Sequence, residues 1–516
     1  METIVTTRRI TKRTALALAV AVLATTGTAT VAGAGPGGGR SGALAGYYGQ
    51  RLDWQSCQQD GSDDVGRALD QAGASCAPVS VPIDYDRPGR GAMTVWISRI
   101  TATGTAHRIG PLVLNLGGPG IPALGSVVDA AAAMGATGAR FDLIGMDVRF
   151  TGRSTPVDCD WPSTWIPRSA GADRASFDRM VALSVDLAHR CAARFRQPLR
   201  NASTVNAARD MDIVRAALGE RSVSFLGYSY GSYLGAKFAQ LFPRRTNRIV
   251  LDSAIDPADP GIHVRGDNGP VREAALLEWE TWAAAHDPDY HLGTSQAAVS
   301  ALIDHIYRTA ADRPLRIGRY RVDDTVVPAL LVNPLSDDGD ASNDQLARFV
   351  RTLADALAGQ TVQPTPDLDD AIAGILTGRN SQFHSGQTAI SCADQPVPRD
   401  IDWYWRDIQR RRTAAPLFGG LNLVSPCAFW PARPVPPVSV SSPAPALIVH
   451  ADGDINATAE LNQAMHRALT GSRMITLDHV RTHGVYLFRG ATCVDDSVNA
   501  YLDTGVLPPA DRHCVE

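Results

Sequence analysis

The chain has 516 residues, several times the length of an average domain, and 44% of them are hydrophobic, so it can bury a large core. We therefore expect one large core with an inserted or appended second unit. The formal net charge of −4 gives no basic excess, which argues against nucleic acid as a partner.

Residues 1–34 have the pattern of an export signal. Basic residues between positions 8 and 13 precede an apolar stretch from Ala15 to Ala24, and the small residues Ala32 and Ala34 predict cleavage after Ala34. An uncleaved membrane anchor is the alternative, but the apolar run is short and rich in threonine for a bilayer span. We expect a secreted protein with no stable membrane association after cleavage.

Residues 35–46 are mainly Gly, Ala and Ser and predict a flexible leader, after which the core begins at residue 47 and continues to residue 255. Buried-strand patterns then recur along the chain with helical stretches between them. This alternation predicts the α/β class, with a mostly parallel sheet covered by helices on both faces. The strand-like runs are Thr94–Ile100, Leu112–Leu116, Phe141–Met146, Val223–Leu226, Ile249–Asp252, Ala446–Val449 and Met474–Leu477.

A Gly-Gly-Pro-Gly loop at residues 117–120 directly follows the strand-like run at 112–116. Glycines let a backbone approach a substrate closely, and Pro119 has no N–H group to donate. Gly118 is therefore the candidate donor for an oxyanion hole, unless the loop is an ordinary Gly/Pro turn.

The pentapeptide Gly227-Tyr-Ser-Tyr-Gly231 lies between a strand-like run and a helix-like stretch from Tyr230 to Phe242. This strand, sharp turn and helix is the setting of a nucleophile elbow, which predicts that Ser229 is a nucleophile. The amide of Tyr230 would then be the second oxyanion donor. The alternative is a Gly-rich loop without a chemical role.

Strand-like runs are absent from residues 256–388, and amphipathic segments take their place, which predicts a helical cap inserted into the core. The chain returns to the core at residues 389–516. The helical segments are Val271–His286, Gln296–Ala311, Gln345–Ala358 and Leu368–Leu376. A cap over the elbow would exclude water and shape the substrate pocket, although a purely structural insert is the alternative.

The acid and base expected to follow a nucleophile elbow occur in the right chain order. Asp454 follows the strand-like run at 446–449, with Asp452 as its competitor. His483 follows the next run and stands before a glycine, whereas His479 lies too close to the strand end to reach the nucleophile. We expect His483 to take the proton of Ser229 and Asp454 to orient the imidazole ring.

Seven motifs together mark a known family: residues 76–85 (CAPVSVPIDY), 115–120 (NLGGPG), 147–154 (DVRFTGRS), 208–212 (ARDMD), 227–231 (GYSYG), 389–394 (AISCAD) and 501–509 (YLDTGVLPP). The chain resembles the secreted α/β-hydrolase exopeptidases of the prolyl and tripeptidyl aminopeptidase kind. That resemblance implies an α/β-hydrolase fold. It also places the nucleophile, acid and base of the family on Ser229, Asp454 and His483.

Three positions depart from the family pattern. Phe150 replaces the glycine of Asp-Pro-Arg-Gly, which would put a bulky ring into a tight loop near the site. Ile121 and Pro122 follow Gly120, where small residues are usual. The acid loop lacks the usual Asp-x-x-Thr-Pro, because Thr458 comes one place late and no proline follows it. None of the three touches the expected triad.

Eight cysteines in an exported chain should be oxidised. Their spacing favours four short loops, a pattern that the family resemblance also implies: Cys57 with Cys76, Cys159 with Cys191, Cys392 with Cys427, and Cys493 with Cys514. The sequence has no C-x-x-C or H-E-x-x-H motif, so we expect neither a metal nor a cofactor.

An aminopeptidase must hold the ammonium group of its substrate, which calls for a carboxylate where the cap meets the core. Asp394, Glu278 and Glu280 are the candidates, with Asp256 as another, and an ordinary surface or structural acid is the alternative for each. The leading hypothesis is a secreted serine aminopeptidase that releases short pieces from peptide N-termini. An esterase acting on small acyl compounds is the alternative, and a binding protein on an inactive hydrolase scaffold is a third hypothesis.

Overall fold

The computed structural model describes residues 40–104, 107–195, 198–261, 268–422, 424–430, 434 and 438–516. Within these residues, nine strands form one sheet in the order β1-β2-β4-β3-β5-β6-β9-β10-β11. All neighbouring strands run parallel except that β2 is antiparallel to both β1 and β4. The strands are β1 (Ser75–Pro82), β2 (Ala92–Ile100), β3 (Gly110–Asn115), β4 (Phe141–Met146), β5 (Val223–Tyr228), β6 (Thr246–Asp252), β9 (Leu447–Ala451), β10 (Arg473–Leu477) and β11 (Arg512–Cys514).

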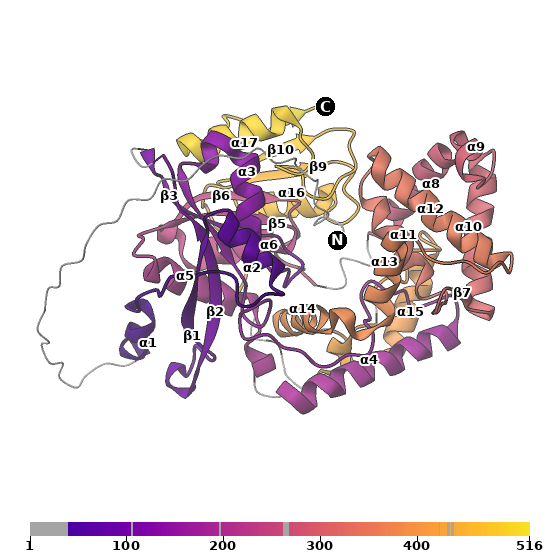
Figure 1. The fold of residues 1–516 in the computed structure, drawn as a ribbon, viewed down its shortest axis with the longest axis horizontal. Helices are drawn as coiled ribbons and strands as arrows, with labels where there is room; N and C mark the ends of the chain where they lie inside the picture. Colours follow the sequence, from indigo (N-terminus) through magenta and orange to yellow (C-terminus); the bar gives the residue numbers. More distant parts are fainter. Residues whose placement is uncertain are drawn as a thin grey trace, which may run out of the picture.

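Helices cover both faces of this sheet (Figure 1). The alternation of side chains along β3 shows the two faces: Val113 packs in one apolar cluster with α5 and α6, and Leu112 and Leu114 pack in another with α3 and α17. This confirms the predicted α/β fold. The helices outside the cap are α1 (Arg40–Tyr48), α2 (Asp64–Gln71), α3 (Ser126–Gly138), α4 (Arg174–Phe195), α5 (Thr204–Ala217), α6 (Tyr230–Leu241), α16 (Ala459–Ala468) and α17 (Thr492–Thr504).

A second body of helices gathers to the right of the sheet in Figure 1. Its apolar side chains, among them Trp279, Leu330 and Phe349, form a cluster of their own, which we call the cap cluster. The elements are α8 (Gly269–Ala285), α9 (Asp287–Tyr290), α10 (Gln296–Asp312), β7 (Leu315–Ile317), β8 (Tyr320–Val322), α11 (Val327–Val332), α12 (Asp340–Leu357) and α13 (Pro366–Leu376). The antiparallel pair β7–β8 corrects the expectation that this region has no strands.

Two further helices, α14 (Ser381–Asp394) and α15 (Ile401–Arg412), precede β9. Ala389 and Ile390 of α14 and Tyr404 of α15 pack in the core cluster that also contains α5 and α6. The polypeptide therefore contacts the core again before it re-enters the sheet. The boundary between the cap and the second part of the core, predicted at residue 389, stays a prediction.

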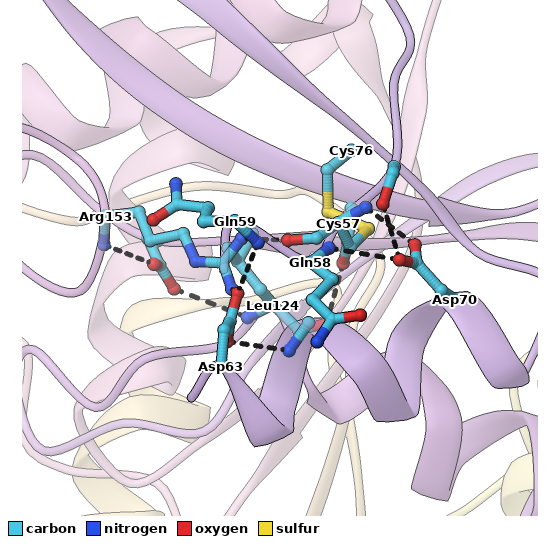
Figure 2. The surroundings of a disulfide bond; sticks show 12 residues. Cys57, Gln58, Gln59, Asp63, Asp70, Cys76, Leu124 and Arg153 are labelled. Atoms are coloured by element: carbon cyan, nitrogen blue, oxygen red, sulfur yellow. Dashed lines mark hydrogen bonds and ion pairs between the residues drawn. A yellow bond between two sulfur atoms is a disulfide. The ribbon is translucent and has the colours of Figure 1, made fainter. Parts of the chain in front are cut away.

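The four disulfides join the predicted partners: Cys57 with Cys76, Cys159 with Cys191, Cys392 with Cys427, and Cys493 with Cys514. Figure 2 shows the first of them beside Arg153. The Arg153 guanidinium donates to the Cys57 carbonyl over 2.6 Å and pairs with Asp63 at 2.5 Å. This disulfide is thereby tied to the loop at residues 147–154, which lies beside the Gly-rich loop after β3.

The predicted export signal, residues 1–34, and residues 35–39 of the predicted leader lie outside the described residues, whereas residues 40–46 of that leader belong to helix α1. In the part of the chain that is described, no helix combines the length and the apolar character needed to cross a bilayer.

Candidate active site

Ser229 stands in the sharp turn between β5 and α6, with φ 53° and ψ −120°, a conformation that costs energy for any residue but glycine. Its amide donates to the Asp252 carbonyl over 2.9 Å. The two flanking glycines are required by space: a Cβ on Gly227 would lie 2.6 Å from the Gly231 backbone, and one on Gly231 would lie 2.7 Å from the Asn115 carbonyl. The turn leaves Ser229 partly exposed at the carboxyl end of the sheet.

His483 and Asp454 form a hydrogen-bonded pair, with 2.8 Å between Nδ1 of the ring and Oδ2 of the carboxylate. Asp454 is fully buried, and its other oxygen accepts the amides of Asn456 and Ala457 over 2.7 and 3.0 Å. These bonds fix the carboxylate toward the ring.

The two competitors, Asp452 and His479, are exposed to solvent. The structure therefore brings together the acid and the histidine that the sequence analysis preferred.

Burial of the His483 ring acts to lower its pKa, but the charge and hydrogen bond of Asp454 outweigh this effect and raise the pKa above its ordinary value. The same bond to Nδ1 leaves the other ring nitrogen, Nε2, available to accept a proton. Such a pair can act as a general base.

Asp252, at the end of β6, connects the loop of His483 with the turn of Ser229. Its carbonyl accepts the Ser229 amide, and its carboxylate accepts the amides of Val485 at 3.1 Å and Tyr486 at 2.7 Å. The Tyr228 hydroxyl adds a bond of 2.9 Å to the Tyr486 carbonyl. The predicted nucleophile and base thus lie at the same edge of the sheet.

Among the described residues, the Ser229 hydroxyl makes no hydrogen bond to His483. Catalytic hydrogen bonds are often long in substrate-free sites and shorten only when substrate binds.

Sequence reasoning missed the role of Asp252, which it treated only as the end of a strand. The available signal was its position: Asp252 and Ser253 are polar residues at the carboxyl end of the strand next to β5. Burial raises the pKa of Asp252 to about 7, against the lowering effect of the Tyr486 and Val485 amides and of His483.

The Gly-rich loop after β3 lies against the Ser229 turn. A Cβ on Gly117 would lie 2.5 Å from the Tyr228 carbonyl and 3.1 Å from Cβ of Ser229. Both Gly117, with φ 92°, and Gly118, with φ 107°, adopt the conformation that favours glycine. Tyr230 is the first residue of α6, where backbone N–H groups have no acceptor within the helix. The Gly-rich loop and the start of α6 thus lie next to each other at Ser229, because a Cβ on Gly117 would also lie 3.3 Å from the Tyr230 nitrogen.

Phe150, the first departure from the family pattern, has its ring in the core. It adopts a φ of 68°, which explains the glycine expected there, and only 2% of the residue is exposed. The backbone of its loop contacts the neighbourhood of the site, because a Cβ on Gly120 would lie 3.0 Å from the Thr151 methyl group. The ring thus packs in the core, while the loop that carries it contacts the Gly-rich loop.

The four candidate acids for binding an amino terminus lie in different places. Asp256, after β6, is half-buried and accepts the Ala258 amide over 2.8 Å. Glu278 on α8 has a side chain that is 72% exposed. One of its oxygens accepts from the guanidinium of Arg481, two residues before His483, in an ion pair of 2.7 Å. Glu280 is buried inside the cap, where it accepts from Ser300 and Gln296 of α10.

Asp394 is buried at the end of α14. Its two oxygens accept the amide and the hydroxyl of Thr204 over 2.7 and 2.6 Å. Burial raises the pKa of Asp394 to about 6, with the bonds from Thr204 acting in the opposite direction. The Thr204 hydroxyl also contacts the Tyr230 hydroxyl at 2.6 Å, so Asp394 is linked to the start of α6.

Metal binding has no candidate in the described ranges, where no group of three or more His, Cys, Asp and Glu side chains is placed to hold an ion.

The chain matches two protein-family models: "alpha/beta hydrolase fold" over residues 110–287 and "TAP-like protein" over residues 415–514. It is 31% identical to the tripeptidyl aminopeptidase of Streptomyces lividans, over 90% of this chain and 86% of the relative. It is 29% identical to the serine protease Hip1 of Mycobacterium tuberculosis, over 92% and 93% of the two chains. It is also 31% identical to carboxylesterase B of the same organism, over 89% of each chain.

Proposed function

Because the chain belongs to the tripeptidyl aminopeptidase-like family of α/β-hydrolase serine peptidases, we propose that it releases short peptides from the free N-termini of its substrates. Ser229 is the nucleophile, His483 the general base and Asp454 the acid that orients it. The observation that supports these roles most strongly is the 2.8 Å bond between His483 and the buried Asp454, at the same sheet edge as the strained turn of Ser229.

The reaction follows from these positions. The Ser229 oxygen attacks the carbonyl carbon of the scissile peptide while Nε2 of His483 takes the hydroxyl proton. The amides of Tyr230 and Gly118 stabilise the resulting oxyanion. His483 then gives the proton to the leaving amine, and water, activated by the same ring, hydrolyses the acyl-enzyme and releases Ser229.

In this proposal Glu278 binds the amino terminus of the substrate. Its carboxylate is exposed at the place where the cap meets the histidine loop, whereas those of Asp394 and Glu280 are buried and hydrogen-bonded to neighbouring side chains. One oxygen of Glu278 can hold Arg481 while the other accepts from a substrate ammonium group. Replacing Glu278 by Gln should raise KM for free peptides and leave acyl esters unaffected.

Secretion is part of the same proposal. Four disulfides are typical of proteins that mature in an oxidising compartment, and residues 1–34 have the pattern of an export signal. The N-terminal residue of protein collected from the culture medium, read by mass spectrometry, should be Gly35.

The test uses chromogenic peptide amides with free or acetylated N-termini, together with simple acyl esters and a Ser229→Ala variant as the control. We expect cleavage of the free peptides and a large loss of rate on acetylation, because the ammonium group is then missing. Equal cleavage of free and acetylated peptides would contradict N-terminal recognition.

An esterase is the second candidate, and the relationship to carboxylesterase B favours it. The same proposed triad would hydrolyse an ester, since the chemical steps are shared. Turnover of esters without turnover of any peptide would establish this alternative. A lack of activity on every substrate, for the parent protein as for Ser229→Ala, would favour a binding role.

A further inference from the structure

The two residues that directly precede His483 are fastened to the cap. The Asp338 amide donates to the Arg481 carbonyl over 2.9 Å, and the Asp338 carboxylate accepts the Arg481 amide over 2.8 Å. The Thr482 hydroxyl donates to the Asp337 carboxylate over 2.8 Å. Asp337 and Asp338 lie just before α12, so two consecutive cap residues hold the backbone on which the histidine stands.

Arg489, beyond His483 in the chain, completes this attachment. Its guanidinium lies 3.3 Å from the Asp337 carboxylate and 3.0 Å from that of Asp338. Two neighbouring carboxylates would otherwise repel each other. The bond to Glu516 and the charges of Asp338 and Asp337 raise the pKa of Arg489, so the cation persists over the working pH range.

The cap also holds the loop that carries Asp454. Ile455 is fully buried in the cap cluster. The side-chain amide of Asn268, just before α8, donates to the carbonyls of Ile455 and Asn456 over 3.2 and 2.9 Å. Both members of the acid and base pair therefore stand on loops attached to the cap.

The turn of Ser229 is attached to the core. Its amide donates to Asp252 in β6, and its carbonyl accepts from Ser232 in α6. The core also holds the histidine loop on the far side of the ring, because the Ser253 hydroxyl accepts the Gly484 amide over 2.8 Å and the Asp252 carboxylate accepts the amides of Val485 and Tyr486. The place of the His483 ring relative to Ser229 is thus set from two sides, by the cap before the ring and by the core after it. A displacement of about 1 Å in such a pair can cost roughly 100-fold in rate.

We propose that Asp337 and Asp338 are positioning residues that set the place of the His483 ring relative to Ser229 by fastening Arg481 and Thr482. This inference rests on the proposed function, in which His483 is the general base. It makes the rate of catalysis depend on the attachment of the histidine loop to the cap, in addition to the attachment of the same loop to the core through Asp252 and Ser253.

The test compares Asp338→Ala with Asp338→Asn and with Asp344→Ala. Asp344 lies on the same α12 helix but pairs with Arg348 inside the cap, so its loss controls for a general effect on the cap. We expect Asp338→Ala to lower kcat about 10- to 100-fold with KM within about twofold. Asp338→Asn should recover most of kcat because its amide oxygen can still accept from Arg481, and Asp344→Ala should match the parent protein.

The pH dependence of kcat distinguishes a positioning role of Asp338 from a purely structural one, because a purely structural role would leave the pH midpoint unchanged. The charged groups that act on the His483 ring are the carboxylates of Asp454 and Asp252. Loosening the loop in Asp338→Ala weakens the pairing with Asp454, so the pKa of His483 should fall and the lower pH limit of activity should move to lower pH.

An unchanged kcat and pH midpoint in a folded Asp338→Ala variant would overturn the inference. Should that variant fail to fold, Thr482→Val removes only the hydroxyl bond to Asp337, and an unchanged kcat there would overturn it equally. His483→Ala separates the two proposals: activity in that variant would overturn the proposed function. An inactive His483→Ala beside a fully active Asp338→Ala would overturn the positioning role alone.

Discussion

The carboxylate of Asp454 acts on His483 in two ways. It raises the pKa of the ring, against the lowering effect of burial, and it accepts a hydrogen bond from Nδ1, which leaves Nε2 available to accept a proton. The first effect sets the pH below which the ring is protonated and cannot act as a base. The second effect fixes the tautomer in which Nε2 carries the lone pair.

The dependence of kcat/KM on pH tests both effects. The base must be neutral, so activity should be lost as the pH falls through the pKa of His483, with a midpoint above about 6.5. In Asp454→Asn, kcat should fall roughly 10⁴-fold because the wrong tautomer is favoured. The residual activity should show a lower midpoint, since the raising charge is gone. A parent midpoint below that of Asp454→Asn would contradict this account.

Sequence reasoning reached Ser229, Asp454 and His483 because each follows a strand of the sheet in a fixed order. It missed Asp252 and Asp338, whose roles depend on contacts between segments far apart in the chain. No spacing in the sequence indicates that Asp338 meets Arg481, 143 positions away.

At the scale of elements, the turn between β5 and α6 depends on close packing as well as on conformation. The missing side chain of Gly231 lets α6 start directly against the Asn115 carbonyl at the end of β3. The same contact brings the Gly-rich loop to the side of Ser229. The turn and the loop are therefore one packed unit.

Gly231→Ala should disrupt the packing between the turn of Ser229 and the Gly-rich loop. The added Cβ would lie 2.7 Å from backbone, so the helix start must shift, at a cost of about 1–3 kcal/mol in the free energy of unfolding and with a loss of activity. Gly61→Ala is the matched control, because a Cβ there meets nothing within 4 Å. Denaturant unfolding and peptide turnover measure the two effects, and equal behaviour of both variants would contradict the packing argument.

All seven strand-like runs in the sequence are strands of the sheet, because long buried runs and helical spacing are strong local signals. The strands β1 and β11 and the pair β7–β8 were not predicted, and each omission has a physical reason. β1 carries Pro78 and Pro82, which an edge strand tolerates but which hide the pattern of a strand. β11 and the pair β7–β8 have three residues per strand, too few to show alternation.

The whole molecule is held together by disulfides as well as by its core and cap clusters. Cys392–Cys427 joins α14, which packs on the core, to a turn 35 positions later in the chain. Replacing both cysteines by alanine should lower the free energy of unfolding by roughly 2–4 kcal/mol, chiefly by freeing the unfolded chain. Denaturant unfolding of the oxidised parent protein and of the double variant measures this difference, and coincident transitions would refute it.

The most direct measurement for the account as a whole is covalent labelling of the intact protein with a fluorophosphonate, followed by mass spectrometric mapping of the adduct. A fluorophosphonate reacts with a serine only when a neighbouring base activates the hydroxyl. We expect a single adduct on Ser229 in the parent protein, formed at a rate that rises with pH, and none in His483→Ala. An unlabelled Ser229 in the active parent protein, or labelling at the same rate in His483→Ala, would contradict the proposed triad.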